Sequence, residues 1–192
     1  MPERYEIRLS GSGGQGLVTA GFILAEAIGV YEGKFVCQSQ SYGPEARGGA
    51  SKSEVIVSDE EIDYPKAIKP DVLLAMNQSA CDTYLFDLKQ GGTLIVDATL
   101  VKQLPTTHAA AIPFARIART EIGREGVANI VALGALAAIT KVVPQKSLEE
   151  AVLARVPAGT EEMNREALQA GIKAARRWLK VSRNDLLPPD RN

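Results

Sequence analysis

The sequence has little of the chemistry that metalloproteins and many enzymes depend on. It contains two cysteines and one histidine in 192 residues. An iron–sulfur cluster is normally held by about four cysteine thiolates, and a zinc site needs closely spaced His or Cys ligands. We therefore expect no metal site in this chain. Cys37 and Cys81 lie far apart in apolar surroundings, which favours two buried thiols in a reducing compartment over the alternative, a structural disulfide.

A strong charge bias and long apolar runs are also missing. The chain has 22 Lys and Arg against 23 Asp and Glu, mixed along its length, so no basic stripe marks a nucleic-acid partner. The most apolar stretch, 129–143, is too short to span a bilayer and carries small residues suited to a packed helix. The first residues lack the apolar core of a signal peptide. We expect a cytoplasmic protein with no membrane partner.

Strand and helix patterns alternate through the first two-thirds of the chain, which predicts an α/β fold. The expected strands cover about 5–9, 34–37, 53–57, 71–76, 93–96 and 109–112, with helices at about 17–28, 78–89 and 161–180. The run 71–76 is continuously apolar, as in a strand covered on both faces. From Pro113 onward the pattern is mostly helical. We predict a single Rossmann-like, three-layer domain over 1–182, with a mainly parallel sheet and a helical C-terminal third, and a tail at 183–192.

A glycine-rich loop, Gly11–Gly16, separates the first expected strand from the first expected helix. Glycines let the backbone turn sharply and approach a ligand closely. The free N–H groups and the dipole of the helix that follows favour a bound phosphate. The alternative is a tight turn without a ligand.

Two common nucleotide sites do not fit this loop. A dinucleotide site needs an acidic residue about twenty residues past the last glycine, and 35–40 reads Phe-Val-Cys-Gln-Ser-Gln. A nucleoside triphosphate loop closes with Lys and Ser or Thr, and this one does not. The loop therefore favours a phosphate-bearing ligand other than NAD or ATP.

A second loop, Tyr42–Ala50, follows the second expected strand and reads YGPEARGGA. Ligands gather at the carboxyl ends of parallel strands, so we expect it beside the glycine loop. Arg47, flanked by small residues and glycines, is suited to grip a phosphate or carboxylate; the alternative is a surface ion pair, for example with Glu45.

Together these motifs resemble the gamma subunits of 2-oxoacid:ferredoxin oxidoreductases. The resemblance rests on the glycine loop, Tyr42–Ala50, 56–65 and 129–136, and covers about Glu6 to Trp178. The form YGPEARGG is most similar to the 2-oxoglutarate type, 2-oxoglutarate synthase. Pyruvate-type and branched-chain or indolepyruvate-type enzymes are the alternatives.

The resemblance implies a subunit that is inactive alone, with the fold of domain III of pyruvate–ferredoxin oxidoreductase. The assembled enzyme would decarboxylate a 2-oxoacid with coenzyme A, giving an acyl-CoA, carbon dioxide and reduced ferredoxin. Thiamine diphosphate and iron–sulfur clusters would belong to alpha and beta partner subunits or a ferredoxin-like delta subunit. This chain would contribute contacts to coenzyme A and no catalytic residue. The residues implied are Gly13, Gly14, Gln15, Gly16, Leu17, Arg47, Asn129 and Asn164.

Structural roles compete with several of these assignments. Asn129 opens an apolar helix, where an N-cap is the alternative. Asn164 falls on the core-facing stripe of the last helix, where a polar side chain needs a buried partner, protein or ligand. His108 has no nearby acidic residue in the sequence to orient it, so we interpret it as a surface or structural histidine. At the level of the whole chain, the alternatives are a module that serves only assembly and a free-standing nucleotide-dependent dehydrogenase.

Overall fold

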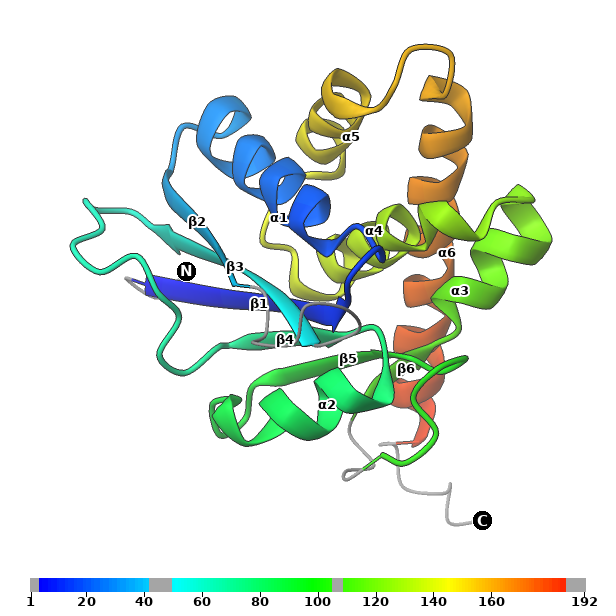
Figure 1. The fold of residues 1–192 in the computed structure, drawn as a ribbon, viewed down its shortest axis with the longest axis horizontal. Coiled ribbons are helices and arrows are strands. Elements are labelled where there is room, and N and C mark those ends of the chain that lie inside the picture. Colours follow the sequence, from blue (N-terminus) through cyan, green and yellow to red (C-terminus); the bar gives the residue numbers. More distant parts are fainter. Residues whose placement is uncertain (1–3, 42–49, 105–108, 186–192) are drawn as a thin grey trace, which may run out of the picture.

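A six-stranded sheet forms the centre of the computed structural model, which describes residues 4–41, 50–104 and 109–185 (Figure 1). The spatial order of the strands is β2-β3-β1-β4-β5-β6. Among these strands, β3 is antiparallel to both of its neighbours, and the other three pairings are parallel. The bounds are β1 (Arg4–Ser12), β2 (Phe35–Ser41), β3 (Ala50–Ser58), β4 (Val72–Ala75), β5 (Thr93–Asp97) and β6 (Ala110–Ile112).

The predicted strand–loop–helix–strand unit is present, with one strand inserted into it. From β1 the chain passes through the glycine loop into α1 (Leu17–Glu26), continues through a π-helical turn (Ala27–Tyr31) and returns in β2. β1 and β2 run in the same direction, but β3 lies between them. The α/β fold is confirmed, and its sheet is mixed because β3 pairs antiparallel with the strand that precedes it.

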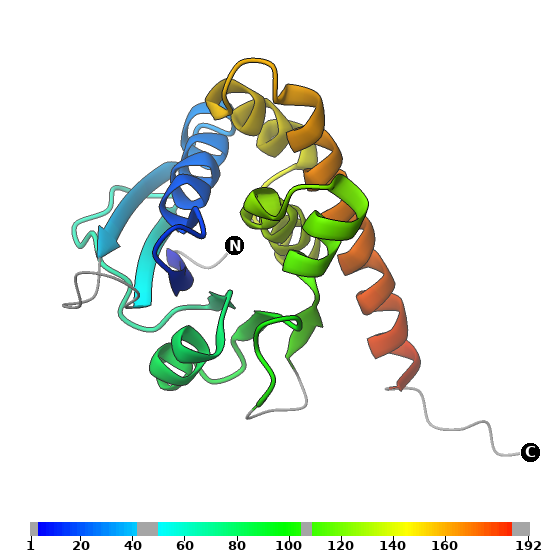
Figure 2. The same cartoon turned by 45° about the vertical axis from the view of Figure 1, so that its right-hand side comes forward.

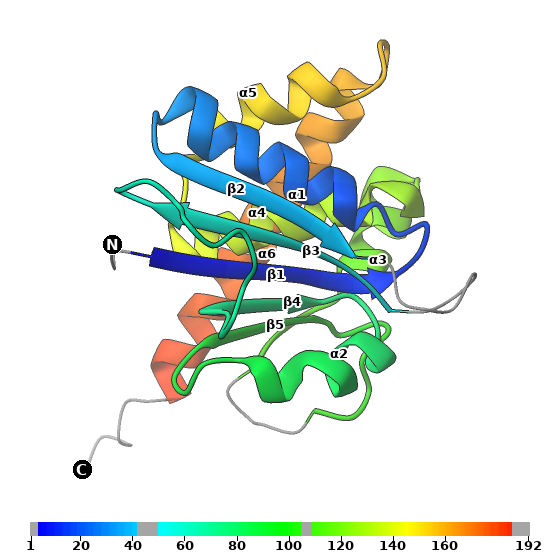
Figure 3. The same cartoon turned by 60° about the vertical axis from the view of Figure 1, so that its left-hand side comes forward.

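The middle strands are covered on both faces, as the apolar run at 71–76 predicted. Alternate residues of β4 enter two separate clusters: Val72 and Leu74 pack toward α1, whereas Leu73 and Ala75 pack toward α2 (Gln78–Tyr84). Asn77 begins α2 by accepting a hydrogen bond from the Ala80 amide, and a short 3-10 turn (Leu85–Asp87) follows α2. Figure 3 shows the resulting layers, with α2 on one side of the sheet and α1 and α5 on the other.

The C-terminal third is helical, as predicted, and is built around α4. α4 is buried over its first ten residues, from Ala128 to Ala137, and makes its most extensive contact with α6. Figure 2 shows α6 running along this helical layer, and α5 contacts both α1 and α6. The helices are α3 (Phe114–Ile117), α4 (Ala128–Thr140), α5 (Gln145–Arg155) and α6 (Glu161–Asp185), with a π-helical turn at Ala118–Ile122 and a 3-10 turn at Glu125–Val127.

The predicted stripe on α6 faces this core. Leu168, Ile172 and Ala175 are buried in it, together with Gly171. No helix in the described ranges is long and apolar enough to cross a membrane. α6 extends to Asp185, beyond the helix end predicted near 180, and the domain boundary after 182 stays a prediction.

Candidate functional site

The glycine loop leaves the amino end of α1 open. Gly16 precedes the helix in a left-handed conformation (φ 73°), and no side chain caps the helix. Gly14 also has a positive φ of 89°, a conformation that glycine adopts without strain. The first amides of a helix have no intrahelical acceptor, and the first turn of α1 contains no acidic residue. The loop therefore presents free N–H groups and a positive dipole end to an anion.

Two of the predicted loop residues have structural side chains. The Gln15 side chain folds back, accepting a hydrogen bond from the Ser12 amide (2.7 Å) and donating to the Met76 carbonyl (3.3 Å). The Leu17 side chain is buried in the core. Only the backbone amide of Leu17 is therefore a candidate for ligand contact, while Gln15 holds the shape of the loop.

Asn129 joins the glycine loop to α4. Its Nδ2 donates to the Gly16 carbonyl (3.0 Å), and its Oδ1 accepts from the Ile130 amide (2.9 Å). α4 begins at Ala128 with Val127 as its N-cap, so the N-cap interpretation of Asn129 is wrong. Both ends of the amide are engaged within the protein, and the side chain fixes the end of the loop against α4.

Asn164 is buried near the start of α6, as the sequence predicted. Its Nδ2 donates to the carbonyl and hydroxyl oxygens of Thr160 at 2.9 and 3.1 Å. Its Oδ1 accepts no hydrogen bond from the described residues, and Asn164 lines a cavity. This oxygen remains available as an acceptor for a ligand.

The two asparagines line the same cavity, of about 210 Å³, between α1, α4 and the turn from α5 to α6. Asn129, which lines the cavity, also donates to the Gly16 carbonyl and so links the cavity wall to the glycine loop. The cavity wall is largely apolar. The lining residues that matter here are Ile23, Arg124, Ile130, Arg155, Met163 and Asn164.

Arg124 is a residue that the sequence analysis missed. Two arginines line the cavity, and Arg155 is paired with Glu26 and stacked over the Phe22 ring. Arg124 is exposed and has no ion-pair partner among the described residues. The sequence signal was available, since Arg124 stands in Gly123-Arg124-Glu125-Gly126, a glycine-flanked setting like the one that singled out Arg47.

Other predicted residues lie apart from this site or outside the described residues. The part of the second loop from Tyr42 to Gly49, which includes Arg47, lies outside the described residues, and so does His108. Both cysteines are free, with Cys37 half-buried and Cys81 buried, so the disulfide alternative is wrong. Burial raises the pKa of the Cys81 thiol, and nearby Asp82 adds to the effect. In the described ranges, no group of three His, Cys, Asp or Glu side chains is placed to hold a metal ion.

The family model for pyruvate ferredoxin/flavodoxin oxidoreductase matches residues 6–174. The chain belongs to this family. A 2-oxoglutarate synthase subunit KorC from Methanocaldococcus jannaschii is 52% identical over 177 residues, which cover 90% of this chain and 95% of that protein. The chain is thus a gamma subunit of a 2-oxoacid:ferredoxin oxidoreductase, as the sequence motifs predicted.

Solved structures of family members agree with the fold. The gamma subunit of a keto/oxoacid ferredoxin oxidoreductase from Geobacter sulfurreducens is 53% identical, with a TM-score of 0.83 over 91% of this chain and 97% of that one. A 2-oxoglutarate:ferredoxin oxidoreductase from Magnetococcus marinus, solved with 2-oxoglutarate, coenzyme A and succinyl-CoA bound, is 25% identical with a TM-score of 0.79. There the similarity covers 92% of this chain but 32% of the Magnetococcus chain.

Proposed function

We propose that this gamma subunit holds coenzyme A for an enzyme that converts a 2-oxoacid, 2-oxoglutarate by similarity, to its acyl-CoA with reduction of ferredoxin. The observation that carries the proposal is that Asn129 joins two features: it bonds Gly16 at the uncapped start of α1, and it lines the cavity together with Asn164, whose Oδ1 is free. Coenzyme A combines phosphate groups with an amide-containing arm. For the phosphates the site offers backbone N–H donors and a cation. For the arm it offers a hydrogen-bond acceptor and an apolar wall.

Each part of the site has a distinct expected role. The amides of Gly13, Gly14 and the first turn of α1 would hold a phosphate group, with Arg124 adding a charge-assisted contact. Asn164 Oδ1 would accept a hydrogen bond from an N–H group of the ligand. Asn129 and Gln15 are positioning residues, since their side chains bond the loop itself.

The size of the cavity fits a ligand that is bound jointly by this chain and a neighbouring subunit. At about 210 Å³ it is smaller than the roughly 300 Å³ and more of pockets that enclose a whole small-molecule ligand. Much of the coenzyme would therefore lie outside this chain, with its thiol directed to a neighbouring subunit. The gamma subunit then contributes by placing the thiol near the reacting centre, which raises its effective concentration there. Thiamine diphosphate, iron–sulfur clusters and the 2-oxoacid pocket belong in this scheme to the alpha, beta and delta partners.

Calorimetric titration of the full-length chain with coenzyme A tests the proposal. An Arg124→Ala variant should bind coenzyme A roughly three- to tenfold more weakly, because a charge-assisted hydrogen bond is lost. Arg119→Ala is the matched control, since Arg119 forms an exposed ion pair with Glu125 on the same segment, and its affinity should be unchanged. Equal loss in both variants, or NAD binding as tightly as coenzyme A, would overturn the assignment.

A further inference from the structure

One face of strand β1 carries a polar side chain at every second residue: Glu6, Arg8, Ser10 and Ser12. This face turns toward α2, because Ile7 and Leu9, which alternate with these residues, pack in the core with α1. The first three polar residues are buried. A buried polar group is costly unless it is hydrogen-bonded. The partners of the four side chains therefore show which of them the fold itself engages.

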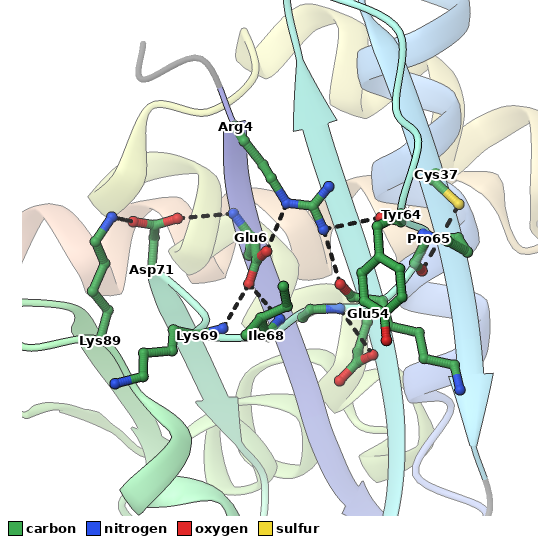
Figure 4. Close-up of polar contacts among 12 residues, drawn as sticks. Arg4, Glu6, Cys37, Glu54, Tyr64, Pro65, Ile68, Lys69, Asp71 and Lys89 are labelled. Carbon is green, nitrogen blue, oxygen red and sulfur yellow. Dashed lines mark hydrogen bonds and ion pairs between the residues drawn. The ribbon is translucent and has the colours of Figure 1, made fainter.

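Glu6 is engaged entirely within the protein (Figure 4). Its Oε2 accepts hydrogen bonds from the amides of Ile68 (2.7 Å) and Lys69 (2.9 Å). Its Oε1 accepts from the Arg4 guanidinium (2.7 Å). Both carboxylate oxygens thus have partners, and the role of Glu6 is structural.

The next two polar residues of this face are engaged in the same way. Arg8 pairs with Glu54 of β3 at 2.8 Å and with Asp87 of the turn after α2. Ser10 Oγ donates to the Leu74 carbonyl of the neighbouring strand β4 (3.1 Å). The Ser10 proton is therefore used inside the sheet.

Ser12, at the end of the strand, differs from the other three. Its Oγ is hydrogen-bonded to Asn77 Nδ2, while Asn77 Oδ1 accepts from the Ala80 amide at the start of α2 (2.8 Å). Because the Asn77 oxygen faces the helix, its NH2 group faces Ser12, and an NH2 group only donates. The Ser12 oxygen is therefore the acceptor in this bond, and its own proton points elsewhere.

The backbone of Ser12 is also engaged, which leaves the hydroxyl proton as its one unused group. The Ser12 amide donates to Gln15 Oε1 (2.7 Å), and the Ser12 carbonyl accepts from the Gln15 amide (3.2 Å). Among the described residues, the hydroxyl proton has no acceptor. Ser12 is half-buried and is followed by exposed Gly13 and Gly14. An oriented donor thus stands at the entrance of the glycine loop.

The place of Ser12 in the sheet fits a ligand-binding role. β1 and β4 are parallel neighbours, and the chain leaves β1 into α1 on one side of the sheet and β4 into α2 on the other (Figure 3). In open α/β sheets, ligands bind outside the carboxyl ends of two strands that diverge in this way. Ser12 ends β1 and Asn77 follows β4, so their hydrogen bond lies at this point.

We infer that Ser12 is a further ligand-binding residue, whose hydroxyl donates to a phosphate oxygen of coenzyme A in a direction that Asn77 sets. A phosphate oxygen is a charged acceptor, and it fits a donor whose proton is unused within the protein. Asn77 acts through Ser12 and is a positioning residue. The inference rests on the proposed coenzyme A site. It adds a side chain to a loop that otherwise offers backbone amides and a helix dipole.

Calorimetric titration of the full-length chain with coenzyme A tests the role of Ser12. Ser12→Ala removes the donor and should weaken binding roughly three- to tenfold. Ser12→Thr keeps a hydroxyl and should restore most of the affinity. Ser79→Ala is the matched control, because Ser79 is an exposed serine of α2 outside the site, and its affinity should be unchanged. Wild-type affinity in Ser12→Ala would overturn the inference.

Reversing the hydrogen bond to Ser12 tests the role of Asn77. Asn77→Asp keeps the cap of α2, since a carboxylate oxygen also accepts from the Ala80 amide. Its second oxygen would accept the Ser12 proton, which is then lost to the ligand. Affinity for coenzyme A should fall, and unchanged affinity would overturn the role of Asn77.

The added negative charge of Asn77→Asp also repels phosphate, and a double-mutant cycle with Ser12→Ala separates the two effects. The fall caused by the aspartate should be at least about threefold smaller in the Ser12→Ala background than in the wild type. An equal fall in both backgrounds would show that Asn77 does not act through Ser12.

Failure of this inference and failure of the proposed function give different results. If Arg124→Ala binds coenzyme A more weakly while Ser12→Ala binds it normally, the coenzyme A site stands and Ser12 is only structural. If the wild-type chain does not bind coenzyme A, the proposed function fails and this inference fails with it.

Discussion

At the scale of single residues, glycines in the same loop serve different needs. Gly16 has a positive φ, and a Cβ there would lie 2.5 Å from Asn129 Nδ2. Gly13 has no positive φ, and a Cβ there would meet nothing within 4 Å. Gly16 is required by the fold, whereas the position of Gly13 is open to a side chain. The glycine-rich sequence identifies both residues as part of the loop, but it cannot distinguish their two roles.

This difference predicts unequal effects of alanine. Gly16→Ala should lower the free energy of unfolding by about 2–3 kcal/mol, since the left-handed backbone costs about 1–2 kcal/mol for an L residue and the Asn129 contact is displaced. Gly13→Ala should change the free energy by less than about 0.5 kcal/mol. Urea denaturation of both variants measures this, and equal losses would show that the loop conformation is not the one described.

At the scale of elements, local sequence patterns predicted which strands and helices are present, but they did not predict the order of the strands in the sheet. The apolar run of β4 and the apolar stripe of α6 were predicted correctly, because the buried residues of each element form a pattern within one short stretch of sequence. The insertion of β3 between β1 and β2 depends on pairings between distant segments, such as Ile7 with Val55, which no local period contains. The burial of Glu6, Arg8 and Glu54 on β1 and β3 could not be predicted for the same reason, since an alternating strand is expected to expose its polar side chains.

The packing of α4 against α6 depends on two glycines. A Cβ on Gly171 would lie 1.9 Å from the Val131 carbonyl oxygen, and one on Gly134 would lie 2.2 Å from the Leu168 carbonyl oxygen. Gly171→Ala should therefore force the helices apart and cost about 1–3 kcal/mol, as overpacking does, despite the better helix propensity of alanine. Gly126→Ala, where a Cβ meets nothing within 4 Å, is the control. Thermal unfolding that is unchanged in Gly171→Ala would contradict this packing.

At the scale of the whole molecule, the proposed coenzyme A site is shared between this chain and its partner subunits. The glycine loop and both asparagines were identified from the sequence, the asparagines through the family resemblance. The structure brings the two asparagines to one cavity and links Asn129 to the glycine loop. The glycine-flanked setting of Arg124 in the sequence could have marked this residue, but only the fold places it at the cavity with the two asparagines. At about 210 Å³ the cavity has room for only part of a ligand of the size of coenzyme A. We expect the isolated chain to show no oxidoreductase turnover.

The most direct test of the central claim is the Michaelis constant for coenzyme A in the reconstituted complex carrying Gly13→Val. A Cβ at Gly13 would meet nothing within 4 Å, so we expect this variant to keep its fold. If this subunit holds coenzyme A, the constant should rise roughly tenfold while kcat and subunit assembly stay unchanged, the pattern expected when ground-state and transition-state binding are lost equally. An unchanged constant in the fully assembled variant complex would contradict the claim and leave the subunit a structural module.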